Sequence, residues 1–272
     1  MEGILTCNLF SKQNRQFEKI KQYSRAFAVN YCGNVIIRDA VFGVISNYAR
    51  KKELPLEILR FPFNDDELWA FTFVKHGTVF LAVNSSLPLC KQFFAAAHEM
   101  YHIYCFAEDT NTGVIDGGSV LDSRTADDIA VTQEDFEANA FAGLLLMPDN
   151  LLYEQIDVYG ISGEVMDIDD VLLLMDLFAV PYKTVIIRLM ETGIISREKA
   201  GTLIEVDYDR IRKRMSLSGK AEQWQKGSDL IYFGSLEDNL DYNIREGLLT
   251  EEREESDRKT VDELRKHLRQ YS

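Results

Sequence analysis

The sequence predicts an α+β fold in which a small antiparallel sheet accompanies a mostly helical C-terminal part. Two runs rich in Phe, Val, Trp and Thr, residues 68–75 and 78–83, flank His76-Gly77 and predict a β-hairpin. Apolar residues also recur at helical spacing over several other segments. The predicted helices cover residues 38–52, 88–107, 133–147, 168–178 and 182–192.

Start and stop signals bound these helices. Pro55 follows the first helix, and Pro88 suits the first turn of the second, because a first-turn N–H has no helical partner to lose. Thr132 and Asp135 resemble a capping box that opens the third helix, and Pro148 ends it. The polar stretch between the second and third helices is expected to be a long loop.

Composition limits the classes of function. The chain has 272 residues, 46% of them hydrophobic and 27% charged, so it is long and apolar enough to bury a core. It carries 30 Lys and Arg against 44 Asp and Glu, a net charge of −14. A field of this sign repels nucleic-acid phosphates and anionic lipids. We therefore expect no direct nucleic-acid partner and no membrane partner.

The sequence also predicts a cytoplasmic location. The first ten residues contain Glu2 and no basic segment of the kind that opens a secretion signal. No apolar run reaches the roughly 18 residues that span a bilayer. The four cysteines form no CxxC pair and are too sparse for a disulfide scaffold, which indicates a reducing compartment.

Three segments of the chain differ in composition. Residues 1–34 mix basic, amide and aromatic residues without a period, and are interpreted as an N-terminal extension. Residues 35–205 contain the predicted sheet and helices and form the expected main domain. Residues 206–272 are rich in charge, and we expect them to be largely helical and solvent-exposed.

The strongest chemical signal is the HExxH motif His98-Glu99-Met100-Tyr101-His102 in the second predicted helix. Residues four apart share a helix face, so both imidazoles can reach one ion. A single histidine on a helix is more often a structural residue, but two at this spacing around a glutamate favour a zinc site. Glu99 is predicted to act as the catalytic base rather than as a ligand.

A catalytic zinc needs a third protein ligand. Cys105 lies too far along the same helix, and no third histidine is well placed, so we expect a carboxylate from the third predicted helix. Glu134, Asp135 and Glu137 are the candidates. Glu137 is favoured because it shares the apolar stripe of Phe141, where an inward-facing acid needs a partner.

Two strings of the sequence resemble one known family. AHEMYH at residues 97–102 and EANAFAGLLLMP at residues 137–148 are similar to sequence blocks of the ImmA/IrrE family of zinc metallo-endopeptidases. The resemblance covers residues 36–205, and residues 206–272 have no counterpart in it. Tyr101 is a departure, because many members of the family carry glycine before the second histidine.

The resemblance implies a zincin-like, gluzincin-type core in which His98, His102 and Glu137 bind zinc and Glu99 is the base. It also implies a protein substrate, usually a helix-turn-helix transcriptional repressor of a mobile element or stress regulon. A separate expectation comes from the order of elements in the chain. The strand at residues 78–83 directly precedes the HExxH helix, and we expect it to offer an edge to an extended peptide.

A different class of function is a DNA-binding or protein-docking regulator that uses a helix pair at residues 170–192. Residues 179–181 would form the turn of a helix-turn-helix. The second helix offers only Lys183 and Arg188 as cations, however, and groove binding normally recruits several phosphate contacts. We therefore prefer a helix pair that packs internally or docks a repressor.

Overall fold

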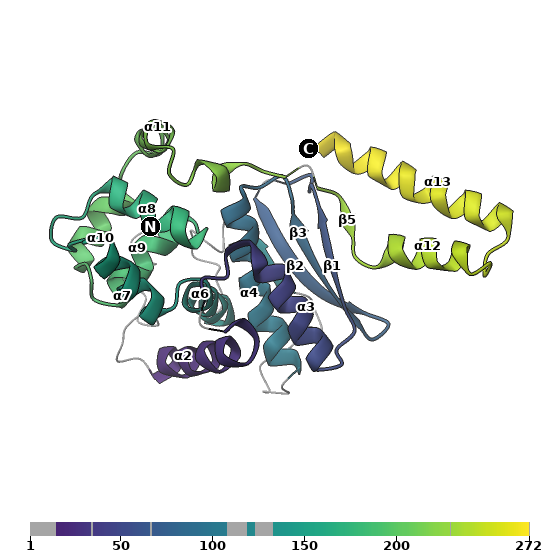
Figure 1. Ribbon diagram of the computed structural model, residues 1–272, viewed down its shortest axis with the longest axis horizontal. Helices are drawn as coiled ribbons and strands as arrows, with labels where there is room; N and C mark the ends of the chain where they lie inside the picture. The colour runs from purple at the N-terminus through teal and green to yellow at the C-terminus, as the bar shows by residue number, and fades with distance from the viewer. Residues whose placement is uncertain are drawn as a thin grey trace.

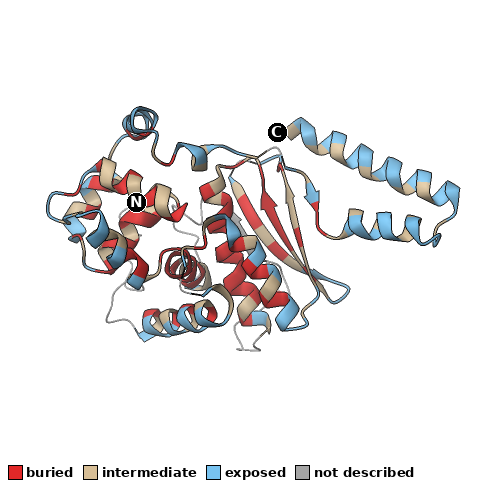
Figure 2. Cartoon of the chain, in the orientation of Figure 1, coloured by how far each residue is buried: buried red, intermediate tan, exposed pale blue. Residues whose placement is uncertain are grey.

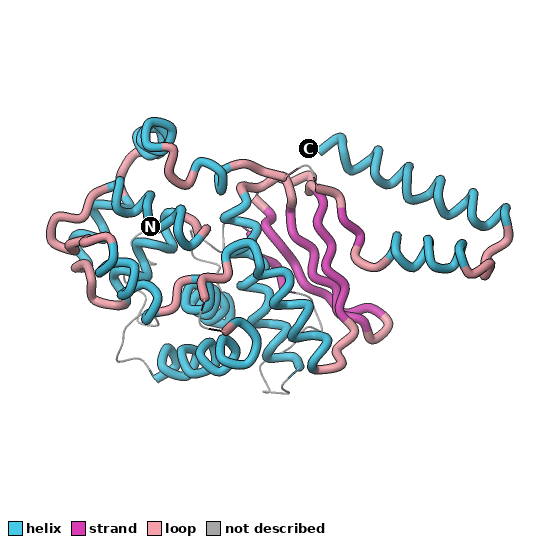
Figure 3. Tube along the Cα trace, viewed as in Figure 1, coloured by secondary structure: helices cyan, strands magenta, loops and turns pink. Residues whose placement is uncertain are grey.

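The computed structural model describes residues 15–33, 35–65, 67–107, 119–122, 133–228 and 230–271. Its architecture is mixed α+β, as predicted, with one sheet and a larger helical part (Figures 1 and 3). The strands are β1 (Leu56–Phe61), β2 (Leu68–Lys75), β3 (Thr78–Asn84), β4 (Ser119–Asp122) and β5 (Tyr232–Phe233). They are arranged in the order β4-β2-β3-β1-β5.

The predicted hairpin is confirmed as β2 and β3. His76 and Gly77 form its turn, both with positive φ (50° and 79°), the geometry that matches the twist of the flanking strands. The sheet is nevertheless mixed rather than purely antiparallel, because β1 lies beside β3 in a parallel pair. The same pairing shows that the expected edge role of β3 was wrong, since β1 and β2 occupy both of its sides.

The five predicted helices are confirmed to within a few residues at their ends. They are α3 (Val41–Lys51), α4 (Leu89–Ala107), α6 (Gln133–Leu146), α8 (Ile168–Phe178) and α9 (Tyr182–Glu191). Further helices complete the described part of the chain: α2 (Arg15–Phe27), α7 (Asp149–Val158), α10 (Arg197–Ile204), α11 (Tyr208–Ser218), α12 (Leu236–Arg245) and α13 (Glu251–Leu268). Among the described residues, no helix combines the length and the apolar character that a membrane crossing requires.

Helix α4 is the centre of the molecule. It packs against β2 and β3 on one side and against α6 on the other, while α3 lies beside it (Figure 1). Fourteen of its nineteen residues are buried, so α4 has almost no solvent-facing side and its polar residues must find partners within the protein (Figure 2).

Helix α2 falls within the segment interpreted as an N-terminal extension. Its residues Phe17, Ile20 and Phe27 are at most 1% exposed and belong to the main hydrophobic core, and the helix packs against α6. Lys21 of α2 also forms an ion pair with Asp149, at 2.5 Å, at the start of α7. This part of the segment is therefore built into the fold.

A buried charge cluster joins α6, α7 and α9. Arg188 is 2% exposed and forms ion pairs with Asp149 and Glu191, and its Nε donates a hydrogen bond to the Met147 carbonyl at 3.1 Å. Burial opposes the charge of Arg188, but the two carboxylates outweigh that effect and raise its pKa. Arg188 therefore acts inside the fold, as a cross-link between helices.

The C-terminal helices α12 and α13 form a hairpin that extends from the sheet edge (Figure 1). Neither helix contains a buried residue (Figure 2). Their charged side chains pair along or between the helices, as in Arg253 with Asp257 at 3.0 Å and Arg258 with Glu254 at 3.2 Å. The hairpin is thus attached to the molecule mainly through β5, which pairs with β1.

Candidate metal centre

The HExxH motif lies in the middle of α4, on the side that faces α6. His98 and Glu99 are fully buried, and His102 is 5% exposed. The Nε2 atoms of His98 and His102 point toward one another and are 3.3 Å apart. Two nitrogens that bind one tetrahedral zinc at about 2.0–2.1 Å lie about 3.3–3.4 Å apart, so this separation fits a shared zinc ion.

The outer nitrogens of both imidazoles are anchored by α6. His98 Nδ1 lies 2.9 Å from Asn139 Oδ1, and His102 Nδ1 lies 3.0 Å from Glu134 Oε1. An amide oxygen and a carboxylate oxygen can only accept, so both Nδ1 atoms carry the proton and donate it. In the neutral rings, this leaves the lone pairs on the two converging Nε2 atoms, the form that a metal ligand requires.

Asp135 supplies an acid to this group. Its Oδ1 lies 4.0 Å from His98 Nε2, and ligand atoms of His98, His102 and Asp135 lie within 4.8 Å of one another. Two imidazole nitrogens and one carboxylate oxygen form a donor set suited to zinc, with a fourth position available for water. Asp135 was among the three acids considered from the sequence.

Glu137, the acid favoured from the sequence, has a different environment. The Tyr101 hydroxyl donates a hydrogen bond of 2.6 Å to Glu137 Oε2, and Gln133 Nε2 donates one of 3.1 Å to Oε1. The inward-facing carboxylate therefore has its partner in Tyr101. Its role as a metal ligand stays a prediction, while the described residues that converge on one point are His98, His102 and Asp135.

Two features of the site were not assigned from the sequence. Asn139 lies four residues after Asp135, on the same face of α6, and this spacing is the signal that connects it with the candidate metal centre. The contact of Tyr101 with Glu137 is the second feature: the sequence marked Tyr101 as a departure from the family pattern, and the structure buries its hydroxyl against Glu137. Burial and this hydrogen bond both raise the pKa of Tyr101, so the phenol keeps its proton.

The two histidines have opposite pKa shifts. The pKa of His98 is lowered to about 3, first because burial penalises its charged form and next because a charge on His102 opposes it. Burial also acts to lower the pKa of His102, but its hydrogen bond to Glu134 and the surrounding carboxylates, Glu99 included, raise the pKa overall. His98 is thus neutral near pH 7, while His102 holds a proton more readily than an isolated histidine.

A buried helix that presents two converging imidazoles and a glutamate to an acid on a neighbouring helix defines a metallopeptidase type of site. The comparison with known families agrees. The family model described as IrrE N-terminal-like domain, Peptidase M78, matches residues 51–190, just over half of the chain, and the chain therefore belongs to the ImmA/IrrE family of metallopeptidases. The match runs from the end of α3 to the end of α9 and includes both α4 and α6. No curated protein matches the chain.

Proposed function

We propose that this metallopeptidase is a zinc-dependent endopeptidase with a gluzincin-type core. The observation that carries the proposal is the 3.3 Å separation of the two Nε2 atoms, with both outer nitrogens held by α6. His98, His102 and Asp135 would hold the zinc. Glu137 is the alternative third ligand, and the experiment below separates the two acids.

The chemistry follows from the residues around this point. Zinc, when bound, would supply Lewis-acid chemistry for peptide hydrolysis. Glu99 follows His98 on the buried side of α4 and would act as the base that accepts the proton of the attacking water and returns it to the leaving amine. Asn139 and Glu134 would keep both imidazoles in the ligand tautomer. The Tyr101–Glu137 pair would hold α4 and α6 in register.

The substrate is proposed to be a cytoplasmic protein, namely a helix-turn-helix repressor of a mobile element or stress regulon. The support is the family to which the chain belongs, together with the net charge of −14, which disfavours a direct role on DNA. Cleavage of such a repressor would release transcription.

The alternative class was a DNA-binding or docking regulator built on the helix pair α8 and α9. One of the two cations on α9, Arg188, is buried in ion pairs with Asp149 and Glu191 and is absent from the surface. This burial supports internal packing of the helix pair. Binding to duplex DNA at two salt concentrations tests it, because a DNA reader shows a steep loss of affinity with salt.

Zinc content is the direct test of the proposed ligands. The wild-type protein should hold about one zinc per chain after reloading and gentle desalting, measured by mass spectrometry of the metal. Asp135→Ala should lose most of it, and Glu134→Ala should lose less, because Glu134 would orient His102 without contacting the metal. If Glu137→Ala loses the metal and Asp135→Ala keeps it, Glu137 is the third ligand.

Proteolysis tests the reaction. Glu99→Gln should keep its zinc and lose peptide hydrolysis, because the amide cannot accept the proton. We would incubate both proteins with a helix-turn-helix repressor encoded beside this chain and map the fragments by mass. Equal cleavage by both proteins would remove Glu99 from the mechanism.

A further inference from the structure

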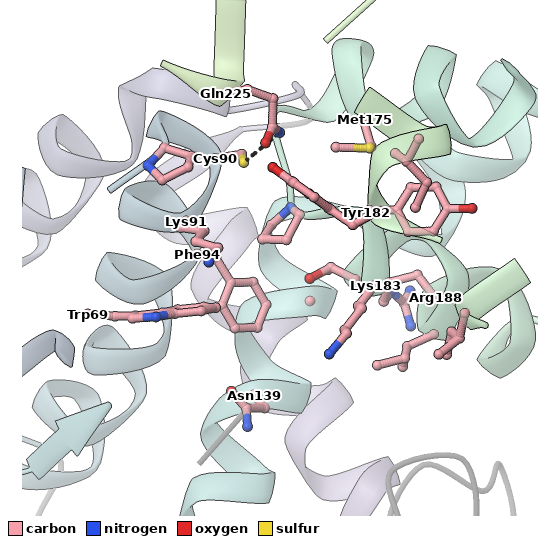
Figure 4. Close-up of a pocket in the computed structure, with 18 of the residues that line it drawn as sticks. Trp69, Cys90, Lys91, Phe94, Asn139, Met175, Tyr182, Lys183, Arg188 and Gln225 are labelled. Atoms are coloured by element: carbon pink, nitrogen blue, oxygen red, sulfur yellow. Dashed lines mark hydrogen bonds between the residues drawn. The ribbon is translucent and has the colours of Figure 1, made fainter. Parts of the chain in front are cut away.

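A cavity of about 490 Å³ lies between α4 and α6 on one side and the helices of residues 168–215 on the other (Figure 4). Most of its lining is apolar, including Phe94, Phe136, Met175, Ile187 and Ile211. Volumes of roughly 300–1,000 Å³ are typical of pockets that enclose a ligand. The cavity is therefore large enough to take one or two bulky side chains.

The cavity adjoins the candidate metal centre at Asn139, while His98, Glu99, His102 and Asp135 are not among its lining residues. Lys91 and Phe94 line it and lie seven and four residues before His98, on the same face of α4. Asn139, which also lines the cavity, accepts the hydrogen bond from His98. In Figure 4 Asn139 lies at one end of the group of lining residues, and Cys90 and Gln225 lie at the other. The cavity thus extends from the His98 region toward the N-terminal end of α4.

We propose that this cavity receives a bulky apolar side chain of the substrate, from a residue within two positions of the scissile bond. The inference rests on the proposed peptidase function and specifies the substrate class. Four residues of α4, a rise of about 6 Å, separate Phe94 from His98, while an extended peptide advances about 3.3–3.6 Å per residue. A substrate held at the metal therefore brings its next one or two side chains to the cavity.

Ile187 is the specificity-determining residue that best tests this inference. It is half-buried on α9, lines the cavity on the wall opposite α4, and takes no part in the group of His98, His102 and Asp135. Ile187→Trp should fill part of the cavity. Met190→Trp is the matched control, because it adds similar bulk to the same helix at a half-buried position outside the lining. Val206→Trp is a second filling variant from another wall, in case the first one folds poorly.

The first experiment measures which residues are preferred around the cleaved bond. A library of proteome-derived peptides would be digested with zinc-loaded wild-type protein. A parallel digest with Glu99→Gln would identify cleavage by contaminating proteases. We expect Phe, Leu, Ile or Met to be enriched at one position within two residues of the cut, and Ile187→Trp to shift that preference to Ala or Ser by roughly 10- to 100-fold in kcat/KM. Cleavage without an apolar preference, or a preference that both filling variants leave unchanged, overturns the inference and leaves the peptidase function standing.

The second experiment reads binding without catalysis. N-acetyl-phenylalanyl-leucinamide should raise the melting temperature of the wild-type protein by roughly 3 °C at ten times its Kd, and N-acetyl-glycinamide should not. The shift should persist in Glu99→Gln and Met190→Trp and be lost in Ile187→Trp or Val206→Trp. Binding of the apolar dipeptide without any peptide cleavage would contradict the proposed peptidase activity but support the cavity as a site for apolar side chains. Absence of binding together with absence of an apolar preference overturns the inference.

Discussion

The helix pair α4 and α6 and the helix pair α12 and α13 use charged residues in opposite ways. In the first pair most residues are buried, and three polar side chains of α4 are each tied to a partner on α6, namely His98, Tyr101 and His102. In the second pair no residue is buried, and the charges meet in water. Ion pairs and hydrogen bonds gain strength as water is excluded, and so does the penalty for removing one partner.

The difference implies that the polar residues of α4 and α6 determine how these two helices pack against each other. Those of the C-terminal hairpin mainly maintain solubility. The sequence alone does not separate the two cases, since both contain acids and bases at helical spacing. Substitutions that remove a single partner measure the difference, either within each pair or in the buried Arg188 cluster that adjoins the end of α6.

The largest effect is expected for Arg188→Ala. It leaves the buried carboxylate of Glu191 and that of Asp149 without their shared cation, and breaking a buried pair costs about 3–5 kcal/mol. The free energy of unfolding, measured in urea, should fall by that amount. A loss below about 1 kcal/mol would show that water can replace Arg188 as the partner of the two carboxylates. It would contradict the idea that burial makes these ion pairs strong.

The next effect is expected for Tyr101→Phe, which removes the shorter of the two hydrogen bonds to the buried Glu137. Loss of a donor to a buried acceptor costs about 1–3 kcal/mol, so the free energy of unfolding should fall within that range. Tyr242→Phe on α12, where the side chain is 51% exposed, is the matched control and should change stability little. Equal effects at both positions would contradict the distinction between the two regions.

The pH dependence of stability tests the same buried cluster. Burial acts to raise the pKa of Asp149, but Arg188 and Lys21 outweigh it and lower the pKa below its usual value of 3.8. A carboxylate with a depressed pKa stabilises the fold above its unfolded pKa, and that contribution is lost as the pH falls through the folded pKa. The stability gap between the wild-type protein and Asp149→Asn should therefore be constant near pH 7 and shrink below about pH 4. A gap that is independent of pH down to pH 2 would contradict this assignment.

The smallest effect is expected for Arg258→Ala on α13. Its partners are Glu254, four residues away on the same exposed helix, and Asp241 on α12, and exposed pairs of this kind contribute about 0.2–1 kcal/mol. The change in unfolding free energy should stay near that value and vanish in high salt, because exposed charges are screened. A loss above 1 kcal/mol would mean that the hairpin supports the fold more than its exposure suggests.

The sequence predicted helices better than pairings, for physical reasons. The end of α6 follows a local signal, Pro148, that acts within a few residues, while its predicted start signal, Thr132, lies outside the described residues. The parallel pairing of β1 with β3 depends on contacts across the chain and leaves no such local signal. The two residues of β5 are too short to show any strand pattern.

The site shows the same limit. The spacing of His98 and His102 was sufficient to place both on one helix face, because the helix itself enforces it. The choice of the third metal ligand among Glu134, Asp135 and Glu137 depends on which residues of α4 face each acid across the α4–α6 interface. The helical wheel gave the buried direction of Glu137 but not its neighbour, the Tyr101 hydroxyl.

The position of β5 also has a consequence for synthesis of the chain. Leu59 and Arg60 of β1 pair with Phe233 and Tyr232, so one border of the sheet is completed only by residues that leave the ribosome long after β1. At translation rates of roughly 5–20 residues per second, that border stays open for about 10 to 30 s. During this interval the nascent protein exposes unpaired strand backbone, the feature that templates aggregation, so truncated products that end before β5 should depend on chaperones more than the full chain does.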